Sequence, residues 1–155
     1  MIKLNNKAFT LTEVLMVTFM ISILVTMMLP KFTKVLDSFR ALEAAQTMRM
    51  VRDAQEARCT LGRKYIVAAD KVKEFDKGKT SGNKYVTANF TYTLTDVGIE
   101  ASCPEKNYQL RMLSYLDGRI CCDECEGFTE KYETCAKLEN LNNFQQIMEN
   151  DPCKS

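Results

Sequence analysis

The segment KAFTLTEVLMVTFMISILVTMMLP, which occupies residues 7–30, decides the fold of this chain. Between Glu13 and Pro30 it carries no charged side chain, and nearly all of its residues are apolar. As a helix, the stretch over residues 9–29 would be roughly 30 Å long, which matches the hydrocarbon thickness of a bilayer. The segment therefore predicts a membrane-spanning helix.

The residues on either side of this helix predict its orientation. The charged residues before it are Lys3 and Lys7, and an excess of positive charge keeps a flank in the cytoplasm, so the C-terminal part should cross the membrane. A secretory signal peptide would have a shorter apolar stretch and then a small-residue cleavage site, which does not follow Leu29. A simple signal anchor does not explain Glu13, because an unpaired charge at the start of an apolar helix costs on the order of 3 kcal/mol.

Residues 7–13, followed by the apolar run and Pro30, resemble the class III signal of type IV prepilins and type II secretion pseudopilins. The resemblance implies that a prepilin peptidase cuts between Ala8 and Phe9 and methylates the new amine of Phe9. Residues 1–8 would then be a cleaved leader. The resemblance also implies a pilin fold, in which a long N-terminal helix carries a small head.

For Glu13, which falls where the family has a glutamate, the resemblance implies a role in assembly together with Phe9 and Pro30. The amine of Phe9 and the carboxylate of Glu13 lie four residues apart, so an axial shift can set the amine of one subunit beside the carboxylate of its neighbour. Ala8 and Ser22 stand where the family usually or often has glycine. Ser22 can donate to a backbone carbonyl and Pro30 has no amide hydrogen, so the helix is a candidate for local melting between them.

Beyond Pro30 the sequence runs to Leu61 without another proline or glycine. This predicts a single helix over residues 9–61, roughly fifty residues long, with an amphipathic second half. Gly62 is the expected C-cap. The face expected to pack on the head consists of Phe32, Leu36, Phe39, Met50, Ala54, Ala57 and Leu61.

The remaining residues, 62–155, predict one small globular head, so the fold class is α+β. A loop over residues 62–88 is followed by alternating patterns that predict strands over residues 89–95 and 107–116. Asp117-Gly118 predicts a two-residue hairpin turn into a third strand. We expect a small antiparallel sheet packed on the amphipathic half of the helix, and a disulfide-bounded C-terminal region.

The head carries two regions of opposite charge. Residues 62–88 hold seven basic and three acidic side chains, a local charge of +4, and residues 121–155 hold three basic and eight acidic ones, a local charge of −5. Solvated surface explains both regions. A sharper hypothesis is that the basic loop of one head meets the acidic region of another.

Seven cysteines are many for 155 residues. Cys122-x-x-Cys125 with Cys121 and Cys135 nearby resembles a thiolate zinc site, but the compartment beyond the membrane is oxidising, which favours disulfides. Pilins commonly close their C-terminal region with a disulfide, and we expect Cys121 or Cys122 to pair with Cys135. Because seven is an odd number, one thiol must be free or must bridge two subunits, and Cys59 and Cys153 are the candidates. The disulfide candidates are Cys59, Cys103, Cys121, Cys122, Cys125, Cys135 and Cys153.

Composition excludes several classes of function. The absence of histidine excludes a Ser-His or Cys-His nucleophile pair. The formal charge is +1 from 21 basic and 20 acidic residues, and −1 once Lys3 and Lys7 leave with the leader, so bulk charge predicts no strong nonspecific nucleic-acid binding. We expect no enzyme activity, no small-molecule substrate, no cofactor and no bound metal, although the acidic residues after Cys122 leave calcium open.

The resemblance implies a structural subunit of a bacterial type IV pilus, a filament used for adhesion, twitching motility or DNA uptake. Expected partners are other copies or other pilins, the prepilin peptidase, the pilus or secretion assembly machinery and, before assembly, the inner membrane. The chain would be a single-pass inner-membrane protein with a cytoplasmic N-terminus, later part of an extracellular pilus or a periplasmic pseudopilus. Two alternatives stay open: a type II secretion pseudopilin, and a membrane-anchored zinc or redox protein that uses its cysteines.

Overall fold

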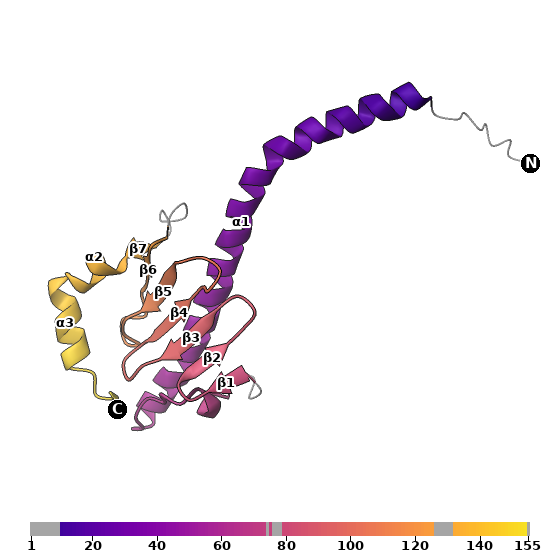
Figure 1. Cartoon of the computed structure of the whole chain (residues 1–155). Coiled ribbons are helices and arrows are strands. Elements are labelled where there is room, and N and C mark those ends of the chain that lie inside the picture. The colour runs from indigo at the N-terminus through magenta and orange to yellow at the C-terminus, as the bar shows by residue number, and fades with distance from the viewer. Residues whose placement is uncertain (1–9, 74, 76–78, 126–131, 155) are drawn as a thin grey trace, which may run out of the picture. The chain divides into compact units, whose positions relative to one another are not determined.

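The structure is a computed structural model that describes residues 10–73, 75, 79–125 and 132–154. The protein is a mixed α+β chain that divides into two compact units, the first ending at Asp37 and the second beginning at Ser38. Helix α1 (Leu11–Thr60) contributes residues to both units (Figure 1).

In the first unit, the described residues from Leu11 onward belong to the N-terminal part of α1. The stretch Leu11–Leu29 is long and apolar enough to cross a membrane, and its residues are exposed in the described part of the chain. Helical backbone continues from Ser22 through Pro30, so the single chain keeps its helix where the sequence suggested melting. A continuous helix satisfies most of its own backbone polar groups, as a bilayer requires.

The second unit, Ser38–Ser155, is built around a seven-stranded sheet whose strand order follows the chain, β1-β2-β3-β4-β5-β6-β7. Neighbouring strands from β1 to β6 are antiparallel, and β7 is parallel to β6. The strands are β1 (Thr80–Ser81), β2 (Lys84–Val86), β3 (Thr91–Leu94), β4 (Ile99–Ser102), β5 (Gln109–Met112), β6 (Ile120–Asp123) and β7 (Glu133–Thr134).

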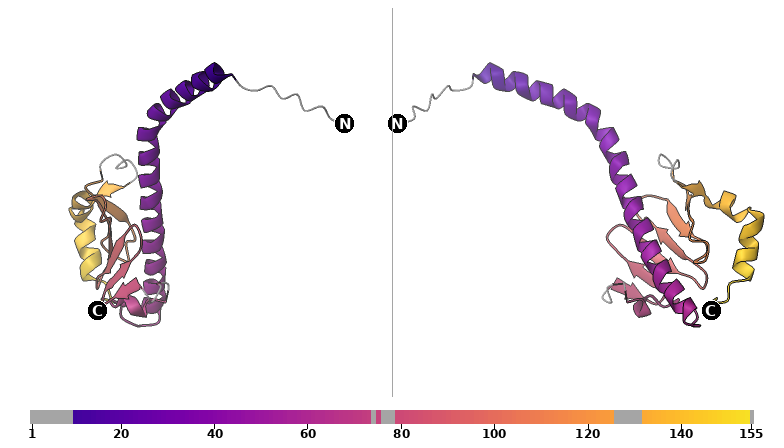
Figure 2. Two further views of the ribbon diagram at one scale, coloured as in Figure 1. Left: turned by 45° about the vertical axis from the view of Figure 1, so that its right-hand side comes forward. Right: turned by 180° about the vertical axis from the view of Figure 1, so that it is seen from behind.

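Three short helical elements lie wholly within the described residues of this unit. The 3-10 turn η1 (Ala69–Lys71) precedes the sheet, and the helices α2 (Cys135–Glu139) and α3 (Asn142–Glu149) follow it. Figure 2 shows the C-terminal half of α1 on one side of the sheet and α3 on the other. The sheet therefore has a face that packs on α1 and a face that α2 and α3 partly cover.

The core of the head lies between the sheet and α1. Alternate residues of the central strands point toward α1, because successive side chains of a strand face opposite ways. On α1 itself the buried residues are small or unbranched at Cβ, apart from Val51. The core residues from the strands are Tyr92, Leu94, Ile99, Ala101, Leu110 and Met112, and those from α1 are Ala41, Ala44, Met48 and Val51.

The predicted packing face of α1 is wrong. Phe39 is 65% exposed, Met50 42% and Leu61 72%. Phe32, Leu36 and Ala57 are exposed as well, and Ala54 is half-buried. The sheet instead packs on a face of alanines, because small residues let a flat sheet approach the helix closely. The buried positions of this face are Ala41, Ala44, Ala45, Met48, Val51 and Gln55.

The end of α1 agrees with the prediction. Gly62 has φ of +70°, the left-handed conformation that glycine adopts without strain. Its amide donates to the carbonyl of Cys59, and the amide of Arg63 donates to the carbonyl of Arg58. These two bonds form a Schellman motif that ends the helix.

The strand predictions are partly confirmed. Strands β3 and β5 lie inside the two predicted ranges, but β4 was missed, and β1 and β2 lie in the predicted loop over residues 62–88. The two-residue turn at Asp117-Gly118 is wrong. Seven residues, 113–119, connect β5 to β6, because Ser114 and Tyr115 turn inward and are buried.

Candidate functional site

The predicted processing residues, Ala8 and Phe9, lie outside the described residues. The description begins at Thr10, and Glu13 lies in the first turn of α1. The geometry of this first turn bears on the assembly role expected for Glu13.

Thr10 and Glu13 form a capping box. The backbone amide of Thr10 donates to Glu13 Oε2 at 2.9 Å, and its hydroxyl donates to the same oxygen at 2.7 Å. In return, the amide of Glu13 lies 3.4 Å from Thr10 Oγ1. Such reciprocal bonds satisfy the free amides at a helix start. The T-x-x-E pattern of residues 10–13 is the signal that sequence reasoning missed.

The capping box gives Glu13 hydrogen bonds but no positive charge. Both groups that donate to its carboxylate, the amide and the hydroxyl of Thr10, are neutral. The side chain is exposed in the single chain. These two contacts leave the charge of the carboxylate without a cationic partner among the described residues, and the exposed side chain is open to a cation.

The hydroxyl side chains within the span Leu11–Leu29 are satisfied locally. Thr18 Oγ1 donates to the carbonyl of Leu15 at 2.9 Å, Ser22 Oγ to that of Thr18 at 2.7 Å, and Thr26 Oγ1 to that of Ile23 at 2.8 Å. The local bond expected for Ser22 is confirmed. Because these polar atoms bond within the helix, the span offers an almost wholly apolar surface.

Six of the seven cysteines form three disulfides. These are Cys59–Cys153, Cys121–Cys135 and Cys122–Cys125. Of the two alternatives for Cys135, the structure has Cys121. The remaining thiol is Cys103, which is buried. The expectation that Cys59 or Cys153 is left over is wrong, because folding brings the end of α1 beside the C-terminal tail.

The Cys59–Cys153 bond is one of several contacts that hold the tail to the end of α1. The amide of Tyr65 donates to the carbonyl of Cys153 at 3.0 Å. The hydroxyl of Tyr65 donates to Asp151 Oδ1 at 3.2 Å, and the amide of Cys153 donates to the same oxygen at 2.9 Å. Burial, and then the negative charge of Asp151, raise the pKa of Tyr65 to about 12. The tail therefore closes the head at the C-terminal end of α1.

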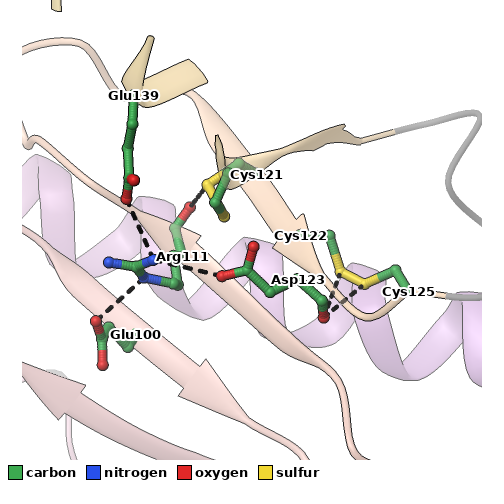
Figure 3. The surroundings of a disulfide bond; sticks show 8 residues. Glu100, Arg111, Cys121, Cys122, Asp123, Cys125 and Glu139 are labelled. Carbon is green, nitrogen blue, oxygen red and sulfur yellow. Dashed lines mark hydrogen bonds and ion pairs between the residues drawn. A yellow bond between two sulfur atoms is a disulfide. The ribbon is translucent and has the colours of Figure 1, made fainter. Parts of the chain in front are cut away.

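The Cys121–Cys135 bond holds α2 on the sheet face that points away from α1. Beside it, Arg111 on β5 is surrounded by three carboxylates (Figure 3). Its guanidinium lies 3.2 Å from Glu100 on β4, 3.4 Å from Asp123 on β6 and 3.3 Å from Glu139 at the end of α2. One planar cation thus links three strands and a helix, and leaves this cluster with a net charge of −2.

The Cys122–Cys125 bond closes a short ring at the end of β6. Within this ring Glu124 has φ of +58°, the one positive value among the non-glycine residues described. The four sulfur atoms of Cys121, Cys122, Cys125 and Cys135 are thus bonded in pairs, whereas a zinc site would need them as thiolates. Among the described residues, no three His, Cys, Asp or Glu side chains are grouped as metal ligands.

The chain was compared with family models, with curated proteins and with solved structures, and none of them matches it. The residues and contacts of the chain itself are therefore the basis for proposing its function.

Proposed function

We propose that the chain is a type IV pilin-like subunit, a membrane-anchored structural protein that polymerises through α1 outside the bacterial inner membrane. The observation that carries the proposal is the exposed apolar span Leu11–Leu29, which begins with a Thr10–Glu13 cap and follows a prepilin-like signal.

None of the span is buried among the described residues. A soluble monomer rarely exposes so large an apolar surface. Lipid covers such a helix before assembly, and neighbouring copies of the same helix cover it afterwards. Both environments accept the span because its threonine and serine hydroxyls bond within the helix.

Glu13 supplies the register of assembly. Its carboxylate is held at the helix start by neutral donors, and the ion pairs of the described residues do not include it. In a polymer, the amine of Phe9 on a neighbouring copy provides that counter-ion at one axial offset. An offset that leaves both charges unpaired in an apolar surrounding is disfavoured.

The head supports export across the membrane. Its three disulfides are typical of proteins that fold in an oxidising compartment. The positively charged flank before the span supports the same orientation, with the head in that compartment.

Cleavage by a prepilin peptidase tests this proposal directly. The full chain is co-expressed with the peptidase in a bacterial host, and the N-terminus of the membrane-bound product is determined by mass spectrometry. We expect a chain that begins at methylated Phe9. Ala8→Gly should be processed at least as fast, and Ala8→Leu should block processing. A mature product that keeps Met1 in the presence of active peptidase contradicts the proposal.

Localisation of the filament separates the pilus from the secretion pseudopilus. In a strain of the source bacterium that lacks the gene, electron microscopy measures surface filaments, and a secretion assay measures exported enzymes. Loss of filaments with normal secretion supports a pilus. Loss of secretion with normal surface filaments supports a pseudopilus.

A further inference from the structure

A small pocket near the C-terminal end of α1 is lined by four cationic side chains. They are Arg58, Arg63, Lys71 and Lys73, and none of the described residues that line the pocket carries a carboxylate. The pocket has a volume of about 310 Å³, and apolar side chains such as Ile66 form the rest of its wall. We refer to these four cationic residues as the basic pocket.

The charges of the basic pocket are not neutralised within the described part of the head. The ion pairs of the described residues involve none of these four side chains. Arg58 donates from Nη2 to the carbonyl of Lys64 at 3.5 Å, but its Nε is buried without a hydrogen-bond partner. Three like charges beside the partly desolvated guanidinium of Arg58 favour an anionic group in the pocket.

A second pocket, of about 420 Å³, lies on the sheet face that points away from α1. Asp96, Glu100 and Glu139 line it together with Arg111, which gives these four side chains a net charge of −2. Apolar residues including Met148 also line it, and they suit the aliphatic stem of a lysine. We refer to the three carboxylates and Arg111 as the acidic pocket.

The two pockets cannot meet within one head. Glu100 and Arg111 alternate with core residues that face α1, so they point to the opposite side of the sheet. The basic pocket is formed by the last turn of α1, by Arg63 just after it, and by Lys71 and Lys73 near η1. Figure 2 shows α1 and the sheet face near α3 on opposite sides of the head.

We propose that the basic pocket of one head binds the acidic pocket of the next copy. This inference rests on the proposed function, because it needs copies that polymerise. Two different surfaces of one molecule that complement each other make a heterologous contact, which generates an open filament when the rotation does not close a ring. A second copy fits better than a nucleic acid, since the chain has a formal charge of only +1 and carries the matching carboxylates itself.

The experiment is a charge swap in the full chain, expressed with its assembly machinery. In the basic variant, Lys71 and Lys73 become glutamate, and in the acidic variant, Asp96 and Glu139 become lysine. The matched control is Lys79→Glu with Lys84→Glu, which makes the same charge change on exposed lysines outside the pocket. Sheared filaments are quantified by electron microscopy and immunoblotting, and the melting temperature of each variant checks its folding.

We expect each pocket variant to lower filament yield on the order of tenfold, while the control stays within about twofold of the wild type. Copies that carry the basic variant, mixed with copies that carry the acidic variant, should recover most of the yield. Equal yields for the basic variant and the control overturn the inference, and so does a mixture that fails to recover although both variants fold. Bound DNA that is lost in the basic variant while assembly is normal also overturns it.

Failure of the proposed function has a different result. If the wild-type chain itself forms no filaments and keeps its leader, the proposed pilin-like function is wrong. The contact between heads, which rests on that function, is then rejected as well. Filaments that form equally well in every charge variant contradict only the contact between heads.

Discussion

Along one helix, α1 changes from a segment that is apolar on every side to a segment that buries one narrow face. The span Leu11–Leu29 has no buried residue, although it is the most apolar part of the chain. Between residues 41 and 55 the helix buries three alanines together with Met48, Val51 and Gln55, and it exposes Met50. The comparison shows that burial within a chain follows fit to a partner, and not hydrophobicity alone.

The two segments are also held in different ways. The head is closed by disulfides, by a seven-stranded sheet and by the Arg111 cluster, all within one chain. The span has only its own helix and the Thr10–Glu13 cap. Changes in the span should therefore affect assembly and leave the head stable, whereas changes in the head should affect stability first.

The largest effect is expected from Glu13→Gln. Glutamine can still accept the bonds of the capping box, but it carries no charge to pair with the amine of Phe9. Filament yield should fall on the order of a hundredfold, because an uncompensated buried charge costs about 3 to 5 kcal/mol. Quantitative electron microscopy measures the yield, and mass spectrometry should show normal cleavage.

Thr10→Val is the matched control for this prediction. It removes the hydroxyl of the capping box and keeps the carboxylate of Glu13. If the charge of Glu13 sets the register, Thr10→Val should assemble nearly as well as the wild type. If Glu13 acted only as a helix cap, Glu13→Gln would assemble normally, and the pairing argument would be lost.

Stability of the head should follow the length of chain that each disulfide closes. The sequence separations are 94 for Cys59–Cys153, 14 for Cys121–Cys135 and 3 for Cys122–Cys125. Loop-closure entropy predicts losses of about 4 to 5, 3 and 2 kcal/mol when each pair is replaced by serine. Urea denaturation of the full chain in detergent measures the three values.

The order of the three losses in the free energy of unfolding tests the prediction more strictly than their absolute values. A loss for the Cys122–Cys125 pair that equals or exceeds the loss for Cys59–Cys153 would show that local strain or packing outweighs chain entropy. Cys103→Ala is the control, because it replaces the buried free cysteine and breaks no disulfide.

Local features of the fold could be predicted from the sequence, and nonlocal ones could not. The apolar span and the glycine end of α1 depend on neighbouring residues, so composition and Gly62 were sufficient. The buried face of α1 depends on which residues the sheet can approach. Alanines carry a weak hydrophobic signal, and the larger Phe39 and Met50 were chosen in their place.

The disulfides show the same limit. Cys59 and Cys153 are separated by 94 residues, and only the folded head brings them together. The partners of Arg111 lie on two strands and on α2, so no spacing in the sequence predicts this cluster. The Thr10–Glu13 cap is a local feature, so the T-x-x-E pattern of residues 10–13 is sufficient to identify it.

Replacing Gly98 by alanine should destabilise the head more than replacing Gly62 by alanine. A Cβ at position 98 would overlap the backbone carbonyl oxygen of Met112, which cannot move without opening the sheet. At Gly62 a Cβ meets nothing within 4 Å, and only the positive φ of +70° opposes it. We expect losses of about 3 kcal/mol for Gly98→Ala and about 1 kcal/mol for Gly62→Ala. Thermal melting of the two variants under oxidising conditions measures the difference, and equal losses would contradict the close approach.

The smallest effect is expected from the pH dependence of Tyr65. Its pKa is raised to about 12, mainly by burial, and burial likewise raises the pKa of Tyr92 to about 12. Because the folded state favours the neutral phenol, this stabilisation is fully present below about pH 10, the ordinary pKa of tyrosine, and is lost as the pH rises toward 12.

Tyr65→Phe removes one of these groups, so the free energy of unfolding should fall less steeply between pH 10 and 12 than in the wild type. At pH 8 the variant should lose about 1 kcal/mol, the value of the hydrogen bond to Asp151. Denaturation curves at pH 8, 10 and 12, with an alkylating agent present to prevent thiol exchange, measure both effects. If the dependence of the free energy of unfolding on pH were the same in Tyr65→Phe as in the wild type, the C-terminal tail would detach before the phenol ionises. The contacts at Cys153 would then not keep the tail bound to the head at alkaline pH.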